Sequence, residues 1–304
     1  MKATILKLTA TATVALISGL LCASASAAIV ANPFHNYEAP DDGSPGTWED
    51  NGTASGGNVL DWSMATGSGV SVVSVTDPAV SFTSAYSLPG GDEVGGTTGS
   101  FGDTASGQSA TFELWFRVNQ ADVSTDQPDV LFETGGSKGT SFFLERNSTT
   151  DEVTLTGVTG DNNNVGTLTY TLDSVDFGVF LQATLVCGST TKLFVNNSAT
   201  DSPDDPTFTV STSAGGDWQT GGNDSGLGRV NAAMQQPATG GDGDWKNAEV
   251  HSFKGEIAIL RHYDNQEFSD TEVNQNFDAL IIPEPATVAL LALAGVALLR
   301  RRRR

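Results

Sequence analysis

Carboxylates are the most abundant chemically active groups in this sequence, which has 36 Asp and Glu residues against 15 Lys and Arg. Hydrolysis of a glycosidic bond uses a pair of carboxylates that flank the bond. On a single strand the pair would appear as E-x-D-x-E or E-x-D-x-x-E, because alternate residues share a face. Neither spacing occurs, and each of these glutamates lacks the required partner: Glu113, Glu133, Glu145, Glu152, Glu249 and Glu256. The sequence therefore predicts a protein without enzymatic activity, although a polysaccharide lyase with dispersed residues would not show this pattern.

Histidine and cysteine, the usual catalytic bases, nucleophiles and zinc ligands, are scarce. His35, His251 and His262 are far apart in the sequence, and no group of His and Cys has the spacing of a zinc site. Cys187 is the only cysteine outside the N-terminal signal described below, so no internal disulfide is expected. Counting alternate residues from Leu181 places Cys187 on an apolar face. We therefore expect a buried, inert thiol at Cys187 and a strand position without a catalytic role for His262.

Calcium is the one metal that the sequence indicates. Asp242-Gly243-Asp244 and Asp161-Asn162-Asn163-Asn164 place oxygen atoms in turn-rich stretches, and Ca²⁺ binds about six to eight such ligands. The alternative is that these Asp, Asn and Gly residues only form tight turns. Our hypothesis is a calcium site that includes Asp242 and Asp244.

Tryptophan side chains offer a second kind of binding surface. Trp218 and Trp245 lie in Gly-rich and Asp-rich stretches that are typical of loops, where an indole ring can stack on the face of a sugar. Loop tryptophans equally plug the ends of β-sandwiches, so both interpretations stay open. Trp115 lies on the polar face of a predicted strand, where it would be either exposed on the sheet or covered by a loop.

The N-terminus has the three parts of an export signal. Lys2 and Lys7 are positive, residues 8–21 carry no charge, and Ala25-Ser26-Ala27 supplies small residues for cleavage. The apolar run is shorter than the roughly 20 residues that span a bilayer, which argues against a permanent anchor. Residues 1–27 are therefore predicted to be a signal helix that is removed, so that the mature chain begins near Ala28.

The C-terminus is also built from three parts. Pro283, Glu284 and Pro285 are followed by an uncharged run at 286–299 and then by five arginines: Arg300, Arg301, Arg302, Arg303 and Arg304. The prolines keep the motif extended, and the apolar run predicts a short transmembrane helix whose arginines stay on the cytoplasmic side. The order of these parts resembles the PEP-CTERM sorting signal. That resemblance implies processing by an exosortase, a membrane-embedded thiol protease, in a Gram-negative bacterium that makes exopolysaccharide, with an ordinary tail anchor as the alternative.

Between the two ends, apolar and polar residues alternate with a period of two. In residues 110–118 every second side chain is apolar, and the intervening positions are Thr111, Glu113, Trp115 and Arg117. This pattern is typical of a strand with one buried face. Further strands are predicted at 130–132, 142–144, 153–155, 167–172, 180–186, 193–195 and 253–259, with edge strands near 70–75 and 80–86. The body is therefore predicted to be an all-β, antiparallel, two-sheet sandwich.

The last strand and the segment after it give two more specific predictions. The alternation places Ile257 and Ile259 on the same face of the strand. Ser269-Asp270-Thr271-Glu272 has the pattern of a capping box, and Phe268 is placed to contact Val273 across the first turn. One short C-terminal helix is therefore expected to follow the last strand.

Several of these stretches resemble LamG-like jelly rolls, which belong to the concanavalin A-like superfamily. The similar strands are 112–118 (FELWFRV), 130–136 (VLFETGG) and 192–197 (KLFVNN). Residues 253–263 and 268–273 resemble the closing strand and helix of that family, so the resemblance covers about residues 100–280. It implies a jelly-roll sandwich in which calcium is frequent and glycan is the expected ligand. Family members often carry a Trp-His-His-Val run where this chain has residues 180–184 (FLQAT), so no function tied to those histidines is expected here.

Charge distinguishes the exported body from its two signals. Residues 28–282 contain 8 basic and 35 acidic residues, a formal charge of −27, whereas the whole chain carries −21. Such a body repels nucleic acid and other anionic polymers unless divalent cations bridge them. The expected parts are the signal at 1–27, the sandwich at 28–281 and the sorting signal at 282–304. We therefore expect an exported, non-enzymatic surface or matrix protein that binds a neutral glycan or uses calcium, with a purely structural matrix protein as the alternative.

Overall fold

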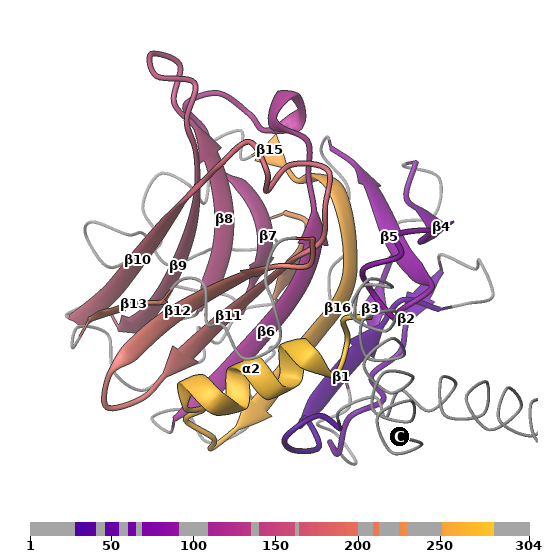
Figure 1. Cartoon of the computed structure of the whole chain (residues 1–304), viewed down its shortest axis with the longest axis vertical. Helices are drawn as coiled ribbons and strands as arrows, with labels where there is room; N and C mark the ends of the chain where they lie inside the picture. The colour runs from indigo at the N-terminus through magenta and orange to yellow at the C-terminus, as the bar shows by residue number, and fades with distance from the viewer. Residues whose placement is uncertain are drawn as a thin grey trace, which may run out of the picture.

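The computed structural model describes residues 28–40, 46–54, 60–64, 69–90, 109–134, 140–161, 164–199, 209–212, 225–229 and 251–282. In these stretches the chain forms two facing sheets, and one short α-helix crosses the outer surface of the larger sheet (Figure 1). This arrangement confirms the predicted all-β, antiparallel, two-sheet sandwich with one C-terminal helix. The signal helix predicted at 1–27 and the transmembrane helix predicted after Pro285 lie outside the described residues. Among the residues described, no helix is both long and apolar enough to cross a membrane.

The larger sheet has eight strands, with β6 and β16 side by side at its centre. Its order is β13 (Thr209–Thr212), β12 (Thr191–Asn197), β11 (Leu181–Cys187), β6 (Ala110–Arg117), β16 (Lys254–Asp264), β5 (Ser84–Pro89) and β4 (Ser71–Ser74), while β1 (His35–Glu38) also pairs with β16. β4 is an edge strand, as predicted near 70–75. The edge strand predicted at 80–86 is wrong, because β5 lies inside the sheet between β4 and the long strand β16.

The smaller sheet has six strands and contains most of the remaining predicted strands. Its order is β10 (Asn164–Leu172), β9 (Val153–Asp161), β8 (Ser141–Arg146), β7 (Asp129–Glu133) and β14 (Gly226–Leu227), with β15 (His251–Ser252) paired parallel to β7. β9 and β10 are antiparallel neighbours in which Asp161 pairs with Asn164, while residues 162 and 163 between them lie outside the described residues. A separate two-stranded sheet joins β2 (Thr47–Trp48) to β3 (Trp62–Ser63), and the 3₁₀ helix η2 (Gln120–Asp122) follows β6.

Apolar side chains from alternate strand positions fill the space between the sheets. β6 contributes Phe112 and Phe116, and the facing strands β7 and β8 contribute Phe132 and Phe142, all fully buried. The ring centroids of Phe112 and Phe132 are 5.9 Å apart. Burying a side chain of this kind contributes about 1.5–3 kcal/mol, so this layer is the main source of stability. Cys187 lies in the same layer, which confirms the predicted buried thiol.

Helix α2 (Asp270–Asp278) begins at the predicted capping box. The Ser269 side chain accepts a hydrogen bond from the Glu272 amide, and the Glu272 carboxylate accepts one from the Ser269 amide. Phe268 and Val273 lie in one apolar cluster with Tyr263 of β16, so both residues of the predicted contact are buried on the same side of the helix start. The helix therefore starts at a fixed point and packs on the side of the larger sheet that faces away from the smaller sheet (Figure 1).

Strand β6 is buried on both faces, so the prediction of a half-buried strand is wrong. Seven of its eight residues are buried. Helix α2 covers the face that carries Glu113 and Trp115, and the Trp115 ring stacks on Phe277 of the helix with 5.6 Å between centroids. The alternation marked this face as polar because Thr and Glu occur on it, but these side chains are hydrogen bonded beneath the helix. Trp115 is therefore covered by a helix. The sequence predicts either exposure on the sheet or cover by a loop, so neither of these two predicted positions is correct.

Strand β16 contains a β-bulge that the period-two pattern does not reveal. Its register with β6 shifts between Ile257 and Ile259. As a result, Ile257 and Leu260 join the core between the sheets, whereas Ala258 and Ile259 join the cluster beneath α2. The prediction that Ile257 and Ile259 share one face is therefore wrong, because one extra residue in a strand reverses the faces that follow it.

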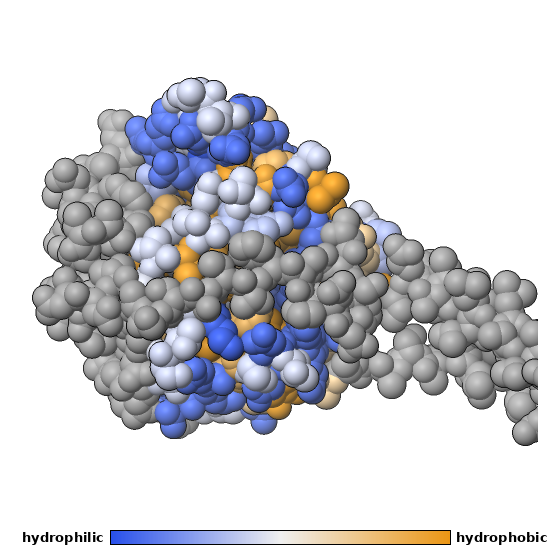
Figure 2. Space-filling view, turned by 60° about the vertical axis from the view of Figure 1, so that its left-hand side comes forward, coloured by the Kyte–Doolittle hydropathy of each residue, from blue (hydrophilic) through white to orange (hydrophobic). Residues whose placement is uncertain are grey.

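The described surface on the face in Figure 2 is mainly hydrophilic, and its hydrophobic residues form small, separate patches. Across the described residues, the large hydrophobic side chains that are exposed are Val175 and Ile282, at 56% and 47%. The described part of this face therefore offers no broad apolar surface, and a binding site is better sought among its polar features.

Candidate functional site

The binding and sorting residues indicated by the sequence lie outside the described residues. They are Trp218, Trp245, Asp242 and Asp244, together with Pro283, Glu284, Pro285 and Arg300 to Arg304. Within the described stretches, no three His, Cys, Asp or Glu side chains are grouped to hold a metal ion. The glycan and calcium sites at the loop residues therefore stay predictions. The described residues contain three other groups with unusual surroundings: a buried carboxylate, a histidine pair and an open pocket.

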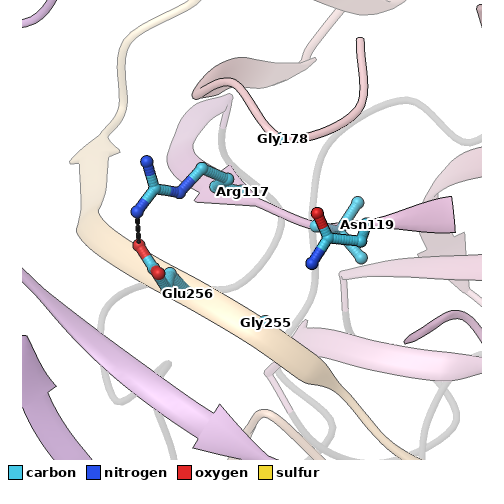
Figure 3. Close-up of a pocket in the computed structure, with 6 residues that line it drawn as sticks. Arg117, Asn119, Gly178, Gly255 and Glu256 are labelled. Atoms are coloured by element: carbon cyan, nitrogen blue, oxygen red, sulfur yellow. Dashed lines mark hydrogen bonds and ion pairs between the residues drawn. The ribbon is translucent and has the colours of Figure 1, made fainter. Parts of the chain in front are cut away.

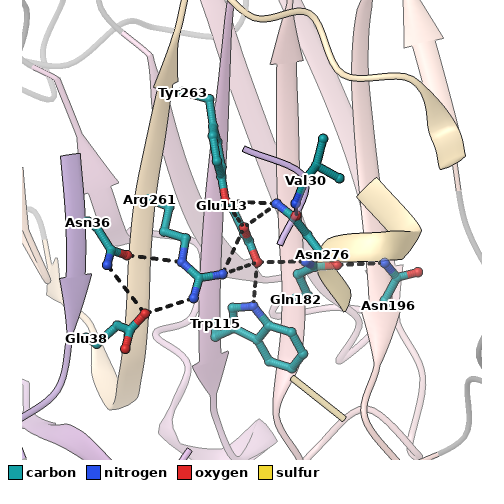
Figure 4. A network of polar contacts seen from close by, with 10 residues as sticks. All are labelled: Val30, Asn36, Glu38, Glu113, Trp115, Gln182, Asn196, Arg261, Tyr263 and Asn276. Atoms are coloured by element: carbon teal, nitrogen blue, oxygen red, sulfur yellow. Dashed lines mark hydrogen bonds and ion pairs between the residues drawn. The ribbon is translucent and has the colours of Figure 1, made fainter. Parts of the chain in front are cut away.

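Glu113 lies at the centre of a buried hydrogen-bond network on the outer face of the larger sheet (Figure 4). Its Oε1 accepts hydrogen bonds from Trp115 Nε1 and Gln182 Nε2, both at 2.8 Å. Its Oε2 accepts from Tyr263 Oη at 3.0 Å and from Asn276 Nδ2 at 3.1 Å. The residue is 1% exposed, so both carboxylate oxygens are occupied by protein groups and enclosed. Glu113 is therefore suited to hold the structure together and unsuited to act as an acid, base or nucleophile.

Arg261 supplies the positive charge that balances Glu113. Its Nη1 lies 3.5 Å from each carboxylate oxygen of Glu113, and its Nη2 donates to Glu38 at 2.9 Å. Burial alone would lower the pKa of Arg261, but the charge of Glu113, with Tyr263 and Glu38, raises it above its usual value. Burial and the neighbouring Glu113 also raise the pKa of Tyr263, so its hydroxyl stays protonated and donates. The network therefore sets the Arg261 guanidinium between buried Glu113 and the more exposed Glu38, with neutral donors around Glu113.

The same network holds helix α2 and the first described residues against the sheet. Asn276 of the helix donates to Glu113, and its Oδ1 accepts a hydrogen bond from the Val30 amide at 2.8 Å. One residue earlier in the helix, Gln275 Nε2 donates to the Ala28 carbonyl oxygen at 3.0 Å. The N-terminal segment that begins at the predicted signal cleavage site is therefore docked on the C-terminal helix.

Two of the three histidines come together in the sheet although they are far apart in the sequence. His35 of β1 is the register partner of His262 of β16, and their rings stack with centroids 5.6 Å apart. His262 is fully buried and also stacks on Phe112 at 4.7 Å, while His35 Nδ1 lies 2.6 Å from Asp50 Oδ2. Burial and the nearby His35 hold the pKa of His262 well below its usual value. The strand position predicted for His262 is confirmed, and its enclosure excludes contact with a dissolved substrate.

A solvent-open pocket lies where β6 ends and β16 begins (Figure 3). Its volume of about 270 Å³ is near the lower end of the roughly 300–1,000 Å³ typical of small-ligand sites. Its lining residues are Arg117, Val118, Asn119, Gly178, Gly255 and Glu256. Figure 3 shows the Arg117 and Glu256 side chains together on one side of this space and Asn119 on the other. The pocket therefore combines a guanidinium, a carboxylate and an amide.

The polar groups of the pocket are positioned by pairing and stacking. Arg117 Nη2 lies 2.6 Å from Glu256 Oε2, and the guanidinium carbon lies 4.6 Å from the centroid of the Phe180 ring. Both side chains of the ion pair remain about one quarter exposed, at 25% and 22%. Asn119 Nδ2 donates to Asp122 at 3.0 Å, which fixes the amide. These groups carry no net charge together and offer fixed donors and acceptors for the hydroxyl groups of a neutral ligand.

Two glycines determine the shape of the pocket. Gly178 has a φ of 77°, which residues with side chains rarely adopt, and its amide donates to the Val118 carbonyl oxygen at 2.9 Å. A Cβ atom at Gly255 would lie 2.6 Å from the Arg117 carbonyl oxygen and would also meet the Phe253 ring. A larger residue at Gly255 would therefore push β16 away from β6 at the pocket.

The sequence reasoning did not identify this pocket. Arg117 and Glu256 are separated by 139 residues, and no local pattern links one to the other. In the sheet they are direct register partners on neighbouring strands. The signal in the sequence is the opposite charge of Arg117 and Glu256 on two predicted strands. Opposite charges form a favourable cross-strand pair, but only when the two strands are known to be neighbours.

Solved structures of similar fold are β-sandwich binding domains. The binding domain of botulinum neurotoxin serotype D/C has a TM-score of 0.50 and 13% identity, over 82% of this chain and 52% of that chain. The receptor-binding domain of botulinum neurotoxin type G has a TM-score of 0.50 and 9% identity, over 81% of this chain and 51% of that chain. The chain thus spans about half the length of these structures, and at such identity the likeness shows the fold alone.

The C-terminal residues 282–304 match the PEP-CTERM protein-sorting motif. The match includes the proline motif, the uncharged run and the arginine cluster that the sequence displays, and it implies an exported protein whose C-terminal region is processed by an exosortase. It begins at Ile282, the last residue that the structure describes. A comparison with curated proteins finds no match. The sorting motif therefore indicates the route of the protein, and the solved structures indicate only the fold of the preceding sandwich.

The network predicts that Glu113→Gln destabilises the fold without creating a cavity. The substitution removes the charge opposite buried Arg261 and turns one acceptor oxygen into a donor that faces other donors. Losing one partner of a buried pair lowers the free energy of unfolding by about 3–5 kcal/mol, which urea denaturation measures. Glu152→Gln is the matched control, because Glu152 is exposed and accepts a hydrogen bond from the Thr150 hydroxyl; its effect should stay below about 0.5 kcal/mol. Equal effects of the two substitutions would contradict this role of Glu113.

The histidine pair predicts that stability falls in mild acid. The folded state keeps His262 neutral, whereas the unfolded chain has an ordinary histidine pKa near about 6.5. Below that pH the unfolded chain binds a proton that the folded chain does not, so the free energy of unfolding decreases by up to about 1.4 kcal/mol per pH unit. Urea titrations from about pH 7.5 to about pH 5 should give a shallower slope for His262→Phe than for the wild type or for His251→Phe. The same slope in all three proteins would count against this assignment.

Proposed function

We propose that this chain is an exported, non-enzymatic protein of the bacterial cell surface or extracellular matrix that binds carbohydrate. The observation that carries the proposal is a β-sandwich followed directly by a PEP-CTERM sorting motif at residues 282–304. An exosortase would process the C-terminal segment, after which the body stays on the outer surface or is released. The resemblance of the strands to LamG-like, concanavalin A-like jelly rolls supports a binding role for the sandwich, and the exopolysaccharide context of PEP-CTERM proteins supports a glycan as its ligand.

The polar pocket supports a neutral glycan as the ligand. Arg117, Glu256 and Asn119 present paired charges and an amide, which suit hydroxyl groups better than an isolated anion. The predicted loop residues Trp218 and Trp245 would add stacking surfaces for sugar rings.

Calcium is proposed as an accessory ion of the same binding function. Asp242 and Asp244 are the expected ligands, and Asp244 directly precedes Trp245 in the sequence, so one loop would present a cation and an aromatic ring together. The charge of −27 on residues 28–282 supports this proposal, because a divalent cation can bridge an acidic protein to the oxygen atoms of a polysaccharide.

A structural matrix protein without a glycan site is the second candidate. It is favoured by the pairing of Arg117 with Glu256, which satisfies the strongest polar groups of the pocket without any ligand. A carbohydrate-active enzyme is a weaker third candidate, because the most strongly bound carboxylate of the described sheet, Glu113, is enclosed. Release of reducing or unsaturated sugar ends by the purified protein would establish that third candidate.

The proposal predicts that Arg117→Ala weakens glycan binding. The substitution removes the guanidinium and releases Glu256, so the affinity for the best ligand on a glycan array should fall by at least about tenfold. Arg146→Ala is the matched control, because Arg146 forms a comparable surface ion pair with Asp151 away from the pocket, and its affinity should match the wild type. Each measurement is made with calcium and with EDTA.

Three outcomes of this experiment have distinct meanings. Loss of binding in EDTA would support the calcium proposal, and Asp242→Asn should then reproduce that loss. Binding that survives Arg117→Ala but disappears in Trp218→Ala or Trp245→Ala would move the site from the pocket to the loops. No saturable binding to any glycan would contradict the carbohydrate proposal and favour the structural candidate.

The sorting motif predicts that the native protein is shorter at both ends. Intact-mass measurement of protein isolated from the cells that make it should show the loss of residues 1–27 and of the arginine cluster at 300–304. Substitution of Glu284 by Ala should leave the C-terminal segment in place, because the motif would no longer be recognised. A native protein with the full-length mass would refute both export processing and sorting.

A further inference from the structure

The residues immediately before the sorting motif are fastened to residues 79–81, which connect β4 to β5 of the larger sheet. After helix α2, the Leu280 carbonyl oxygen accepts a hydrogen bond from the Ser81 amide at 2.8 Å, and the Ile282 amide donates to the Ala79 carbonyl oxygen at 2.8 Å. Between these two bonds, Val80 and Ile281 form an antiparallel β-bridge. We name residues 280–282, in this docked position, the C-terminal latch.

Side-chain packing supports the latch as well as the backbone. Val80 is 3% exposed and lies in the apolar cluster beneath helix α2, and Leu280 and Ile281 pack against that cluster. The turn that receives the latch is itself fixed, because the Ala79 amide donates to Asp77 Oδ1 at 2.9 Å. The latch is therefore part of the folded body and not a loose extension of it.

The latch leaves almost no chain between the folded body and the sorting motif. Ile282 is both the last latched residue and the first residue of the PEP-CTERM match. Extended chain covers about 3.3–3.6 Å per residue, so Glu284 lies at most about 7 Å from Ile282. The uncharged run begins at Ala286, directly after the motif. The motif is thus confined between the sandwich on one side and the predicted membrane segment on the other.

We propose that the folded sandwich restricts the processing of its own sorting motif, and that cleavage requires release of the C-terminal latch from Ala79 to Ser81. The proposal rests on the proposed function, because it concerns the enzyme that processes the PEP-CTERM signal. A processing enzyme needs a stretch of free chain on both sides of the bond that it cuts. Hydrolysis of that bond consumes one water and yields a new carboxylate on the body and a new amine on the released segment.

Local opening would then set the rate of processing. Segments at the end of a fold open more readily than its core, and cleavage of such a segment follows the fraction of molecules in which it is open. The latch has two backbone hydrogen bonds and a partly buried contact, so it can open while the two-sheet core stays closed. Processing is thereby limited to molecules in which residues 280–282 have separated from residues 79–81. After cleavage, residues 280–282 can dock on residues 79–81 again.

A disulfide across the latch tests this proposal in the full-length chain. Val80 and Ile281 lie between the two cross-strand hydrogen bonds, so they form a non-hydrogen-bonded antiparallel pair, whose Cα atoms are about 4.5 Å apart. This separation suits a disulfide. The double substitution Val80→Cys and Ile281→Cys, expressed in the cells that make the protein, should slow C-terminal processing by at least about tenfold relative to the wild type. Pulse labelling followed by intact-mass measurement gives the rate.

Two companion variants make the result specific. Ser71→Cys with Ser87→Cys introduces a disulfide between β4 and β5 in the same sheet, at another antiparallel register pair, and should leave processing unchanged. A six-residue Gly/Ser insertion between Ile282 and Pro283 should raise the rate in the wild type and restore it in the latched disulfide variant, because the motif then becomes accessible without opening.

The outcomes separate this proposal from the sorting proposal. Slow processing of the latched variant, with rescue by the insertion, supports control by the latch. A rate in the latched variant and in the insertion variant equal to that of the wild type overturns it while leaving sorting intact. Retention of the full C-terminus in every variant, including the insertion variant, refutes the sorting proposal and this inference together.

Discussion

The buried charge pair of Glu113 and Arg261 determines how the outer layer of this protein is assembled. A carboxylate beneath a helix loses its hydration, so protein donors must replace the lost water. Here the four neutral donors come from β6, β11, β16 and helix α2, and helix residue Asn276 extends the network to Val30. None of these elements can move away without leaving a buried charge incompletely solvated. The network therefore fixes the helix and the N-terminal segment to the two central strands.

Burial distinguishes the polar side chains that only stabilise the fold from those that solvent, and therefore a ligand, can reach. Glu113 and His262 are both enclosed, with exposed fractions of 1% and 0%. The pocket at the end of β6 instead leaves Arg117 and Glu256 partly open to solvent, with their charges already balanced. On a strongly acidic body, such a neutral site favours a ligand rich in hydroxyl groups over an anion. The arrangement of charges thus supports the proposal that the ligand is a neutral glycan.

The sequence predicts the strands and the start of the helix, because the pattern that indicates each of them lies within a few consecutive residues. The alternation in 110–118 marks β6, and Ser269 with Glu272 marks the first turn of α2. The residues of β6 do not show that its second face is buried, because that burial depends on helix α2, which lies much further along the sequence. The bulge after Ile257 adds one residue without altering composition. The pocket depends on the register of β16 with β6, so the sequence directed attention only to loop residues such as Trp218.

The contact between Val30 and Asn276 joins residues separated by 246 positions, and Glu113 and Arg261 are separated by 148. Contacts so distant in sequence form only when the whole intervening chain is available, and folds that depend on them form slowly. If the predicted signal at 1–27 leads the chain across a membrane, β6 would emerge long before β16 and α2. In the proposed export, the larger sheet and its helix would therefore be completed late, when only the C-terminal segment remains to follow.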